Sequence, residues 1–216
     1  MVDTASRPQT IETDTWIPAE WDDYLVLCEK PEHAKARCYY DNAWMRLEMA
    51  ALGPLHGRET AVVLKVIGLF AAFKNIRAVE LMNTSFRKAG DREAQPDIAF
   101  YLGQVFQLPP RNNQPVDIAI YGAPTLAVEI ASTTLNDDLG RKRLLYERLG
   151  VEEYWVVNVV TSEVLAFAVK NGGSREIRTS QVLPGLELSM VEAAMQRSQA
   201  EDDSALTRWL IQTFQP

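Results

Sequence analysis

The chain has 216 residues, 47% hydrophobic and 24% charged, a balance that fits one globular domain with some appended structure. It contains no apolar segment long enough to cross a bilayer, and its polar start lacks the pattern of a secretory signal, so we expect a soluble cytoplasmic protein. The net charge of −7 argues against a nucleic-acid partner, because positive surface drives phosphate binding, although residues 74–148 hold ten basic and nine acidic residues and are the least acidic part.

The first third of the chain predicts helix, hairpin and helix. Residues 15–31 have apolar positions at helical spacing and predict a short amphipathic helix that starts near Pro18. Residues 37–49 predict a hairpin that turns at Asp41-Asn42. The long apolar segment 53–75 predicts a buried helix.

Strands and one loop follow in the middle of the chain. Residues 76–83 and 96–102 predict strands, and the Pro-rich stretch 107–115 predicts a loop. Residues 116–121 predict another short strand, and residues 125–130 predict a strand that carries one carboxylate among apolar residues.

The last part of the chain alternates a helix with strands. Residues 137–149 predict a helix that ends at Gly150, followed by strands at 153–160 and 163–170 and a final helix after Pro184. We find no internal repeat. The order of elements predicts a mixed α/β domain rather than a regular alternation.

The chain contains two cysteines. Cys28 and Cys38 show no metal-ligand spacing and are expected to be free buried thiols.

The carboxylate in the strand at 125–130 is the most unusual feature of the sequence. Side chains alternate along a strand, so Leu126, Val128 and Ile130 should point to one face, and Glu129 should share the other face with alanines. A charge on such a face is unfavourable unless water, a cation or a hydrogen-bond partner receives it. With Asp97 at the start of a nearby strand, the pair would favour a hard cation such as Mg²⁺.

Four blocks of sequence resemble a known family. They are LEMAALGPLHG (47–57), QPDIAFYL (95–102), LAVEIAST (126–133) and DLGRKRLLYERLGVEEYW (138–155). In this order they resemble the restriction-endonuclease family that is abundant in cyanobacterial genomes, within the PD-(D/E)XK nuclease superfamily. The resemblance covers about residues 18–190. It implies a restriction-endonuclease-like core, with a central mixed β-sheet flanked by helices, preceded by an N-terminal arm (1–17) and followed by a C-terminal helical tail (191–216).

The resemblance also implies a catalytic set. Asp97 and Glu129 match the two metal-binding carboxylates, but the motif lysine expected at position 131 is Ala131. Close relatives share this departure, which implies a lysine from the next helix, here Lys142. Asp138, Lys142 and Tyr146 recur every four residues and should share one helix face. The structural alternatives are a strand-edge or turn role after Pro96 for Asp97, an ion pair of Glu129 with Lys142 or Arg141, and an exposed helix charge for Lys142.

Five further residues are accessory candidates. Cys38 stands where many relatives have a glutamate, and Glu48 is the candidate substitute. The others have structural alternatives: capping or packing for His56, strand termination for Ser132, helix-dipole stabilisation for Asp138 and half-buried packing for Tyr146.

Two functions of different class remain open. The resemblance implies a Mg²⁺-dependent DNA endonuclease, with Mn²⁺ as an alternative cofactor and a homodimer as the assembly. The other is a catalytically silent member of the fold that binds nucleic acid or a protein partner, since fold does not establish function.

Overall fold

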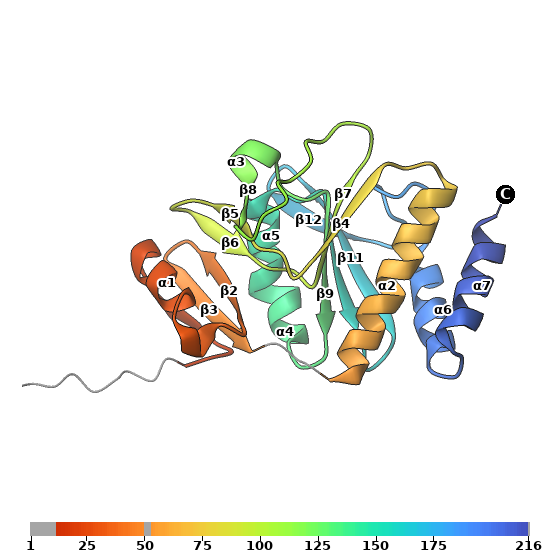
Figure 1. Ribbon diagram of the computed structural model, residues 1–216, viewed down its shortest axis with the longest axis horizontal. Coiled ribbons are helices and arrows are strands. Elements are labelled where there is room, and N and C mark those ends of the chain that lie inside the picture. Colours follow the sequence, from red (N-terminus) through yellow and green to blue (C-terminus); the bar gives the residue numbers. More distant parts are fainter. Residues whose placement is uncertain (1–11, 50–52, 216) are drawn as a thin grey trace, which may run out of the picture.

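The computed structural model describes residues 12–49 and 53–215, which form two six-stranded mixed sheets with helices packed against them (Figure 1). The N-terminal sheet contains β1 (Trp16–Pro18), β2 (Ala36–Asp41), β3 (Trp44–Met49), β5 (Phe86–Lys88), β6 (Arg92–Ala94) and β8 (Val116–Asp117). The central sheet contains β4 (Ala78–Met82), β7 (Ile98–Leu102), β9 (Leu126–Ala131), β10 (Glu153–Asn158), β11 (Glu163–Lys170) and β12 (Gly173–Ile177). The orders are β1-β3-β2-β6-β5-β8 and β12-β11-β10-β9-β7-β4.

Helices cover both faces of the central sheet (Figure 1). Among the described residues, six helical segments lie outside the connection between β9 and β10: α1 (Trp21–Cys28), η1 (Pro31–His33), α2 (Pro54–Phe73), α3 (Ile118–Tyr121), α6 (Leu188–Ser198) and α7 (Asp203–Phe214). The connection between the parallel strands β9 and β10, called the crossover below, contains α4 (Leu135–Asp137), η2 (Asp138–Lys142) and α5 (Arg143–Leu149). Helices α2, α6 and α7 lie on one face, while α5 lies between the other face and the N-terminal sheet. The expected mixed α/β fold with a central sheet flanked by helices is confirmed.

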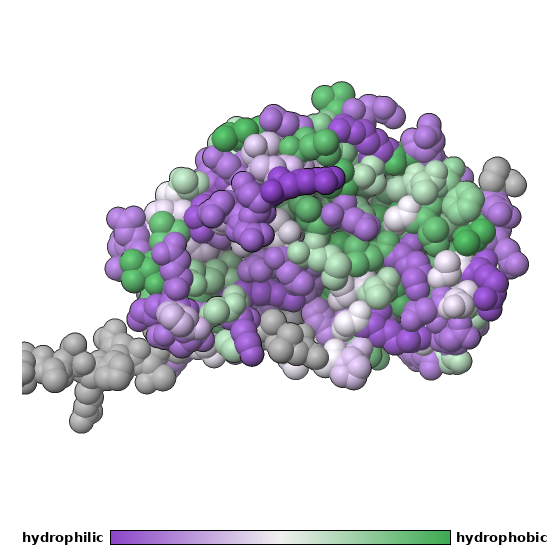
Figure 2. Space-filling view, viewed as in Figure 1, coloured by the Kyte–Doolittle hydropathy of each residue, from purple (hydrophilic) through white to green (hydrophobic). Residues whose placement is uncertain are grey.

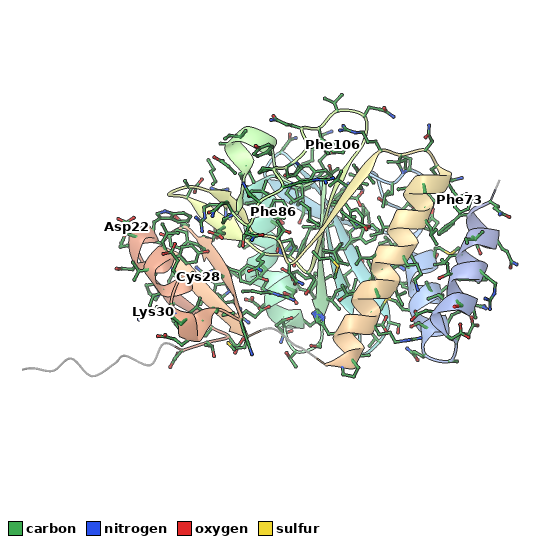
Figure 3. The ribbon with its side chains drawn as sticks, viewed as in Figure 1. Asp22, Cys28, Lys30, Phe73, Phe86 and Phe106 are labelled. Carbon is green, nitrogen blue, oxygen red and sulfur yellow. A yellow bond between two sulfur atoms is a disulfide. The ribbon has the colours of Figure 1, made fainter. Side chains whose placement is uncertain are left out.

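The alternation predicted for β9 divides two hydrophobic cores. Leu126, Val128 and Ile130 belong to the core under α2, α6 and α7. Ala127 and Ala131 belong to the core under α5, which also contains Phe86 of the N-terminal sheet, labelled in Figure 3. Both faces of β9 are buried, and the Glu129 side chain is buried with them.

The crossover from β9 to β10 differs from the continuous helix expected at 137–149. Its first helical residue is Leu135, earlier than expected. It contains the π-helical stretch η2, in which Gly140 has non-helical angles of φ −99° and ψ −105°. Such stretches are rare and are often found at functional sites. The helix ends as expected at Gly150, which adopts φ 93°, a conformation that glycine allows without strain.

Several local expectations were wrong. Residues 116–121 form only two residues of strand before the helical turn α3, because the Asp117 side chain caps that turn by accepting from the Ala119 backbone N–H at 2.9 Å. The short helix expected to start near Pro18 is present as α1, which begins at Trp21, whereas Pro18 itself ends β1. The β5–β6 hairpin was not predicted. Cys28 and Cys38 are not free thiols but form a disulfide that joins α1 to β2; Cys28 is labelled in Figure 3.

The C-terminal part of the chain differs from the expected single helix. The single helix expected after Pro184 is a pair, α6 and α7, which packs on α2. The division into arm, domain and tail stays a prediction, and residues 1–11 of the arm lie outside the described residues.

Hydrophilic and hydrophobic residues are interspersed on the face of the molecule seen in Figure 2. No helix within residues 12–49 and 53–215 combines the length and the apolar character needed to cross a membrane.

Candidate functional site

Asp97 and Glu129 lie beside each other on neighbouring strands. Strands β7 and β9 pair antiparallel with Ile98 opposite Val128, and continuing this register by one residue places Asp97 opposite Glu129. Asp97 Oδ2 accepts a hydrogen bond from the Ile130 backbone N–H at 2.8 Å. Asp97 is 3% exposed and Glu129 is 1% exposed. The fold thus brings two buried carboxylates together at the end of β7.

One arginine joins the two carboxylates. Arg37 of β2 donates through Nη2 to Asp97 Oδ1, and its Nη1 lies 4.0 Å from Glu129 Oε2. The same Nη1 lies 3.9 Å from Oε1 of Glu48 on β3. Burial opposes the charge of Arg37, but Asp97, Tyr39 and Glu129 together outweigh burial and raise the arginine pKa above its usual value. Arg37 therefore stays a cation among three carboxylates.

Lys142 is the second buried cation and it is fully enclosed. Its Nζ lies 2.7 Å from Glu48 Oε2, 2.9 Å from Asp138 Oδ1 and 3.9 Å from Glu129 Oε1. All three contacts are ion pairs. Burial alone would lower the pKa of Lys142, but Glu129, Asp138 and Glu48 together raise it above its usual value. Lys142 is therefore held as an ammonium ion.

Two tyrosines complete the surroundings of Glu129. The Tyr146 hydroxyl donates to Glu129 Oε1 at 2.7 Å, and the Tyr39 hydroxyl lies 3.3 Å from the same oxygen. Lys142 Nζ lies 4.4 Å from the centre of the Tyr39 ring, a cation–π distance. Burial and the neighbouring carboxylates raise the pKa of both tyrosines, so they remain neutral hydrogen-bond donors.

The carboxylates around Lys142 respond differently to burial. Burial raises the pKa of Glu129 well above its usual value; Lys142 opposes this shift, whereas Asp138, Asp97 and Glu48 add to it. Burial also opposes the ionisation of Glu48, but Lys142 and Arg46 outweigh it and lower the pKa of Glu48. Burial raises the pKa of Asp138 as well, and Lys142 opposes that shift too. An added cation beside Glu129 would favour its ionised form.

His56 and a pocket lie on the open side of Asp97. His56 Nε2, in the first turn of α2, lies 3.0 Å from Asp97 Oδ1. A pocket of about 400 Å³ adjoins both residues. Besides these two, it is lined by Ala34, Lys35, Ala36, Arg37, Gly53, Gly57, Thr60, Met82, Asn83 and Gln95. The pocket gives a polar ligand access to Asp97.

The structure brings most of the predicted site residues together. Asp97, Glu129 and Lys142 form one cluster, and four of the five accessory candidates adjoin it: Glu48, His56, Asp138 and Tyr146. Ser132 follows β9, and among the described residues its side chain forms no hydrogen bond or ion pair with the cluster. The roles of all these residues stay predictions.

Some structural alternatives were wrong and one is present. Lys142 is not an exposed helix charge, and Tyr146 is fully buried rather than half-buried. The ion pair between Glu129 and Lys142, which was the structural alternative for Glu129, does exist at 3.9 Å. It does not exclude a catalytic role, because Lys142 contacts Glu48 and Asp138 more closely.

Two residues of the cluster, Arg37 and Tyr39, were not predicted from the sequence. Both lie on β2, where alternate residues point toward the carboxylates while Cys38 and Tyr40 point into a separate core with Tyr24. A charged residue inside an aromatic strand was the available signal, and it is the same signal that identified Glu129.

Asp97 and Glu129 are the two carboxylates of the cluster considered as ligands of a divalent cation. Within residues 12–49 and 53–215, no group of three or more His, Cys, Asp or Glu side chains is placed to hold a metal ion. Asp97 and Glu129 offer two carboxylates that already share one cation of the protein, the Arg37 guanidinium. Mg²⁺ is commonly bound by one or two carboxylates together with waters and substrate phosphates. The two carboxylates are therefore a donor set that Mg²⁺ accepts, although in this structure Arg37 pairs with both of them.

Comparisons with known proteins place the chain in a family. Residues 21–201 match the family Uma2, described as "Putative restriction endonuclease". A crystal structure of a "putative nuclease belonging to DUF820" from Anabaena variabilis ATCC 29413 has a similar fold, with a TM-score of 0.53 and 18% identity, over 89% of this chain and 99% of that chain. No curated protein matches the chain. Because the family match spans most of its length, this chain belongs to the Uma2 family.

Proposed function

We propose that this protein is a Mg²⁺-dependent endonuclease that hydrolyses DNA phosphodiester bonds, with Mn²⁺ as an alternative metal. The observation that carries the proposal is the placement of Asp97 opposite Glu129 on neighbouring strands, with the buried ammonium of Lys142 3.9 Å from Glu129. Membership of a nuclease-like family supports it.

Each residue of the cluster has a role in this proposal. Asp97 and Glu129 would hold the metal, whose chemistry when bound is a lower pKa for a coordinated water and stabilisation of charge on the phosphate. Lys142 keeps its proton, because its pKa lies above the usual lysine value, so it acts as a fixed positive charge and donor rather than as a general base. Tyr146 orients Glu129 by donating to Oε1.

A basic surface beside α5 supports DNA as the substrate. Arg92, Arg141 and Arg148 line a pocket of about 550 Å³ together with Trp44, and two aspartates, Asp41 and Asp91, line it as well. Arg148 pairs with Asp41 and Arg92 pairs with Asp91, but none of the ion pairs of the described residues includes Arg141. The Arg141 guanidinium lies 4.4 Å from the ring of Trp44, an aromatic side chain that is 36% exposed. An arginine without a carboxylate partner beside an exposed aromatic ring suits a phosphate and a stacked base.

Cleavage of supercoiled plasmid DNA over a panel of divalent metals tests the proposed function directly. We expect nicked and linear products with Mg²⁺ or Mn²⁺ and none with EDTA. Binding of DNA without cleavage under every metal would contradict the proposal and favour the catalytically silent alternative. Linear products formed without a nicked intermediate would additionally support the proposed homodimer, in which two sites act on two strands.

The substitution Arg141→Gln tests the basic surface. We expect weaker binding of a DNA duplex, to a similar extent for different sequences, and a salt dependence of the binding constant reduced by about one unit of log–log slope. Fluorescence anisotropy in EDTA measures both without cleavage. Arg178→Gln is the matched control, because Arg178 is an exposed arginine that pairs with Glu192 of α6, on the opposite face of the central sheet. Equal slopes for the parent and Arg141→Gln would rule out this surface.

A further inference from the structure

Arg37 occupies the space between the proposed metal ligands. Three carboxylates from different strands approach its guanidinium: Glu48 from β3, Asp97 before β7 and Glu129 from β9. Arg37 itself comes from β2 and is 8% exposed. Its closest carboxylate is Asp97, and Nη2 also donates to Asn83 Oδ1 at 3.2 Å. In this arrangement the guanidinium provides positive charge where a metal ion would otherwise have to provide it.

A guanidinium and a divalent cation would compete for these oxygens. Both need the lone pairs of Asp97 and Glu129, and at contact distance the two positive charges would repel each other in a poorly solvated site. Glu48 does not remove the conflict, because its Oε2 is already paired with Lys142 at 2.7 Å. Binding of a metal by Asp97 and Glu129 is therefore favoured when the Arg37 side chain leaves them.

The pocket of about 400 Å³ provides a place for the displaced side chain. Arg37 already lines it, together with the polar side chains of Asn83 and Gln95. Arginine is long and has several rotatable bonds, so a change of rotamer can move the guanidinium while the backbone of β2 stays paired. In the pocket its planar array of donors matches a phosphate group in geometry and charge.

We infer that Arg37 is an exchangeable internal counter-ion: it pairs with Asp97 and Glu129 in the metal-free protein and moves into the adjoining pocket, toward the substrate phosphate, when a divalent cation binds. This rests on the proposed function, because it takes Asp97 and Glu129 as the metal ligands. It assigns to Arg37 a positioning role that the motif residues do not cover.

Calorimetric titration with Mn²⁺, without DNA, tests the exchange. Arg37→Gln removes the competing charge, so we expect Mn²⁺ to bind at least about tenfold more tightly than to the parent, a change of about 1.4 kcal/mol. Arg87→Gln is the matched control, since Arg87 lies in the same sheet and pairs with the buried Glu93 but contacts no carboxylate of the cluster. It should bind Mn²⁺ like the parent.

Glu129→Gln separates the two hypotheses. If Glu129→Gln abolishes Mn²⁺ binding while Arg37→Gln binds like the parent or more weakly, the metal site stands and the exchange is overturned. If Glu129→Gln binds Mn²⁺ like the parent, the proposed metal site fails and the exchange fails with it.

If Arg37→Gln does not fold, a second variant, Arg37→Lys, tests the exchange instead. Arg37→Lys keeps the charge on a shorter side chain without the planar fork, so it should compete less well and bind Mn²⁺ with intermediate affinity. Thermal unfolding with and without Mn²⁺ supplies an independent readout, and the rise in Tm on adding metal should be larger for Arg37→Lys than for the parent. An equal or smaller rise would overturn the exchange.

Discussion

Replacing Asp97 by asparagine or Glu129 by glutamine is expected to lower Mg²⁺-dependent DNA cleavage by about 10³-fold or more. Each change removes one of two carboxylates from the proposed metal site, and charge stabilisation by a bound metal contributes several kcal/mol to the transition state. At about 1.4 kcal/mol for each tenfold change in rate, a loss of that size is about three orders of magnitude. Plasmid cleavage under single-turnover conditions measures it.

The two variants should differ in the stability of the metal-free protein. Asp97→Asn leaves the charged Arg37 without its closest partner and removes the carboxylate beside His56, so we expect a lower Tm. Glu129→Gln keeps the shape of a carboxyl group whose ionisation burial already disfavours, so we expect a Tm equal to or above that of the parent. Thermal unfolding in EDTA compares them.

Glu153→Gln is the control for removing a buried carboxylate. Glu153 is fully buried on β10 and accepts hydrogen bonds from Trp155 and Ser180, but it contacts no residue of the cluster. This variant should unfold at a lower temperature and, where it is folded, cleave DNA at the parental rate. Parental cleavage by both Asp97→Asn and Glu129→Gln would refute the site.

Replacing Lys142 by methionine is expected to slow cleavage by about 10²- to 10⁴-fold, the usual scale for one positioned catalytic group. Methionine fills much of the volume of lysine, which matters because the side chain is fully buried. The change also leaves Glu48, Glu129 and Asp138 without their shared ammonium. Breaking a buried ion pair in this way costs about 3–5 kcal/mol, so stability must be measured alongside rate.

Adding Ala131→Lys to this variant should restore part of the rate. Ala131 lies two residues from Glu129 on the same face of β9, about 6–7 Å along the strand, so a lysine there would point toward the same carboxylates. Recovery should be incomplete, because a long side chain in place of a buried alanine costs about 1–3 kcal/mol in strain.

The controls for Lys142 distinguish catalysis from packing. Lys65→Met removes a lysine of α2 that pairs with Asp203 away from the cluster, and it should cleave like the parent. A folded Lys142→Met variant with the parental rate would show that Lys142 does not replace the motif lysine. A folded double variant without recovery, combined with a weaker salt dependence of DNA binding in Lys142→Met, would assign Lys142 to phosphate binding instead.

The sequence by itself determined the parts of the fold and site that depend on local periodicity. Alternation along β9 separated Ile130 from Glu129 because strand side chains alternate whatever surrounds them. The four-residue spacing of Asp138 and Lys142 placed both on one helix face, and their ion pair at 2.9 Å survives the π-helical stretch between them. The mixed α/β order and the end of the helix at Gly150 follow from the same local rules.

Only the tertiary structure decided which distant residues complete the cluster. Arg37 and Glu48 come from a hairpin more than 45 residues before Asp97, and they reach it because the N-terminal sheet packs across α5 against the central sheet. The burial of Lys142 depends on the same packing, since spacing along a helix fixes a face but does not determine what covers it. Long-range packing depends on the summed contacts of many residues rather than on any one motif. For that reason the sequence predicted the two carboxylates and the lysine but not the arginine that lies between the carboxylates.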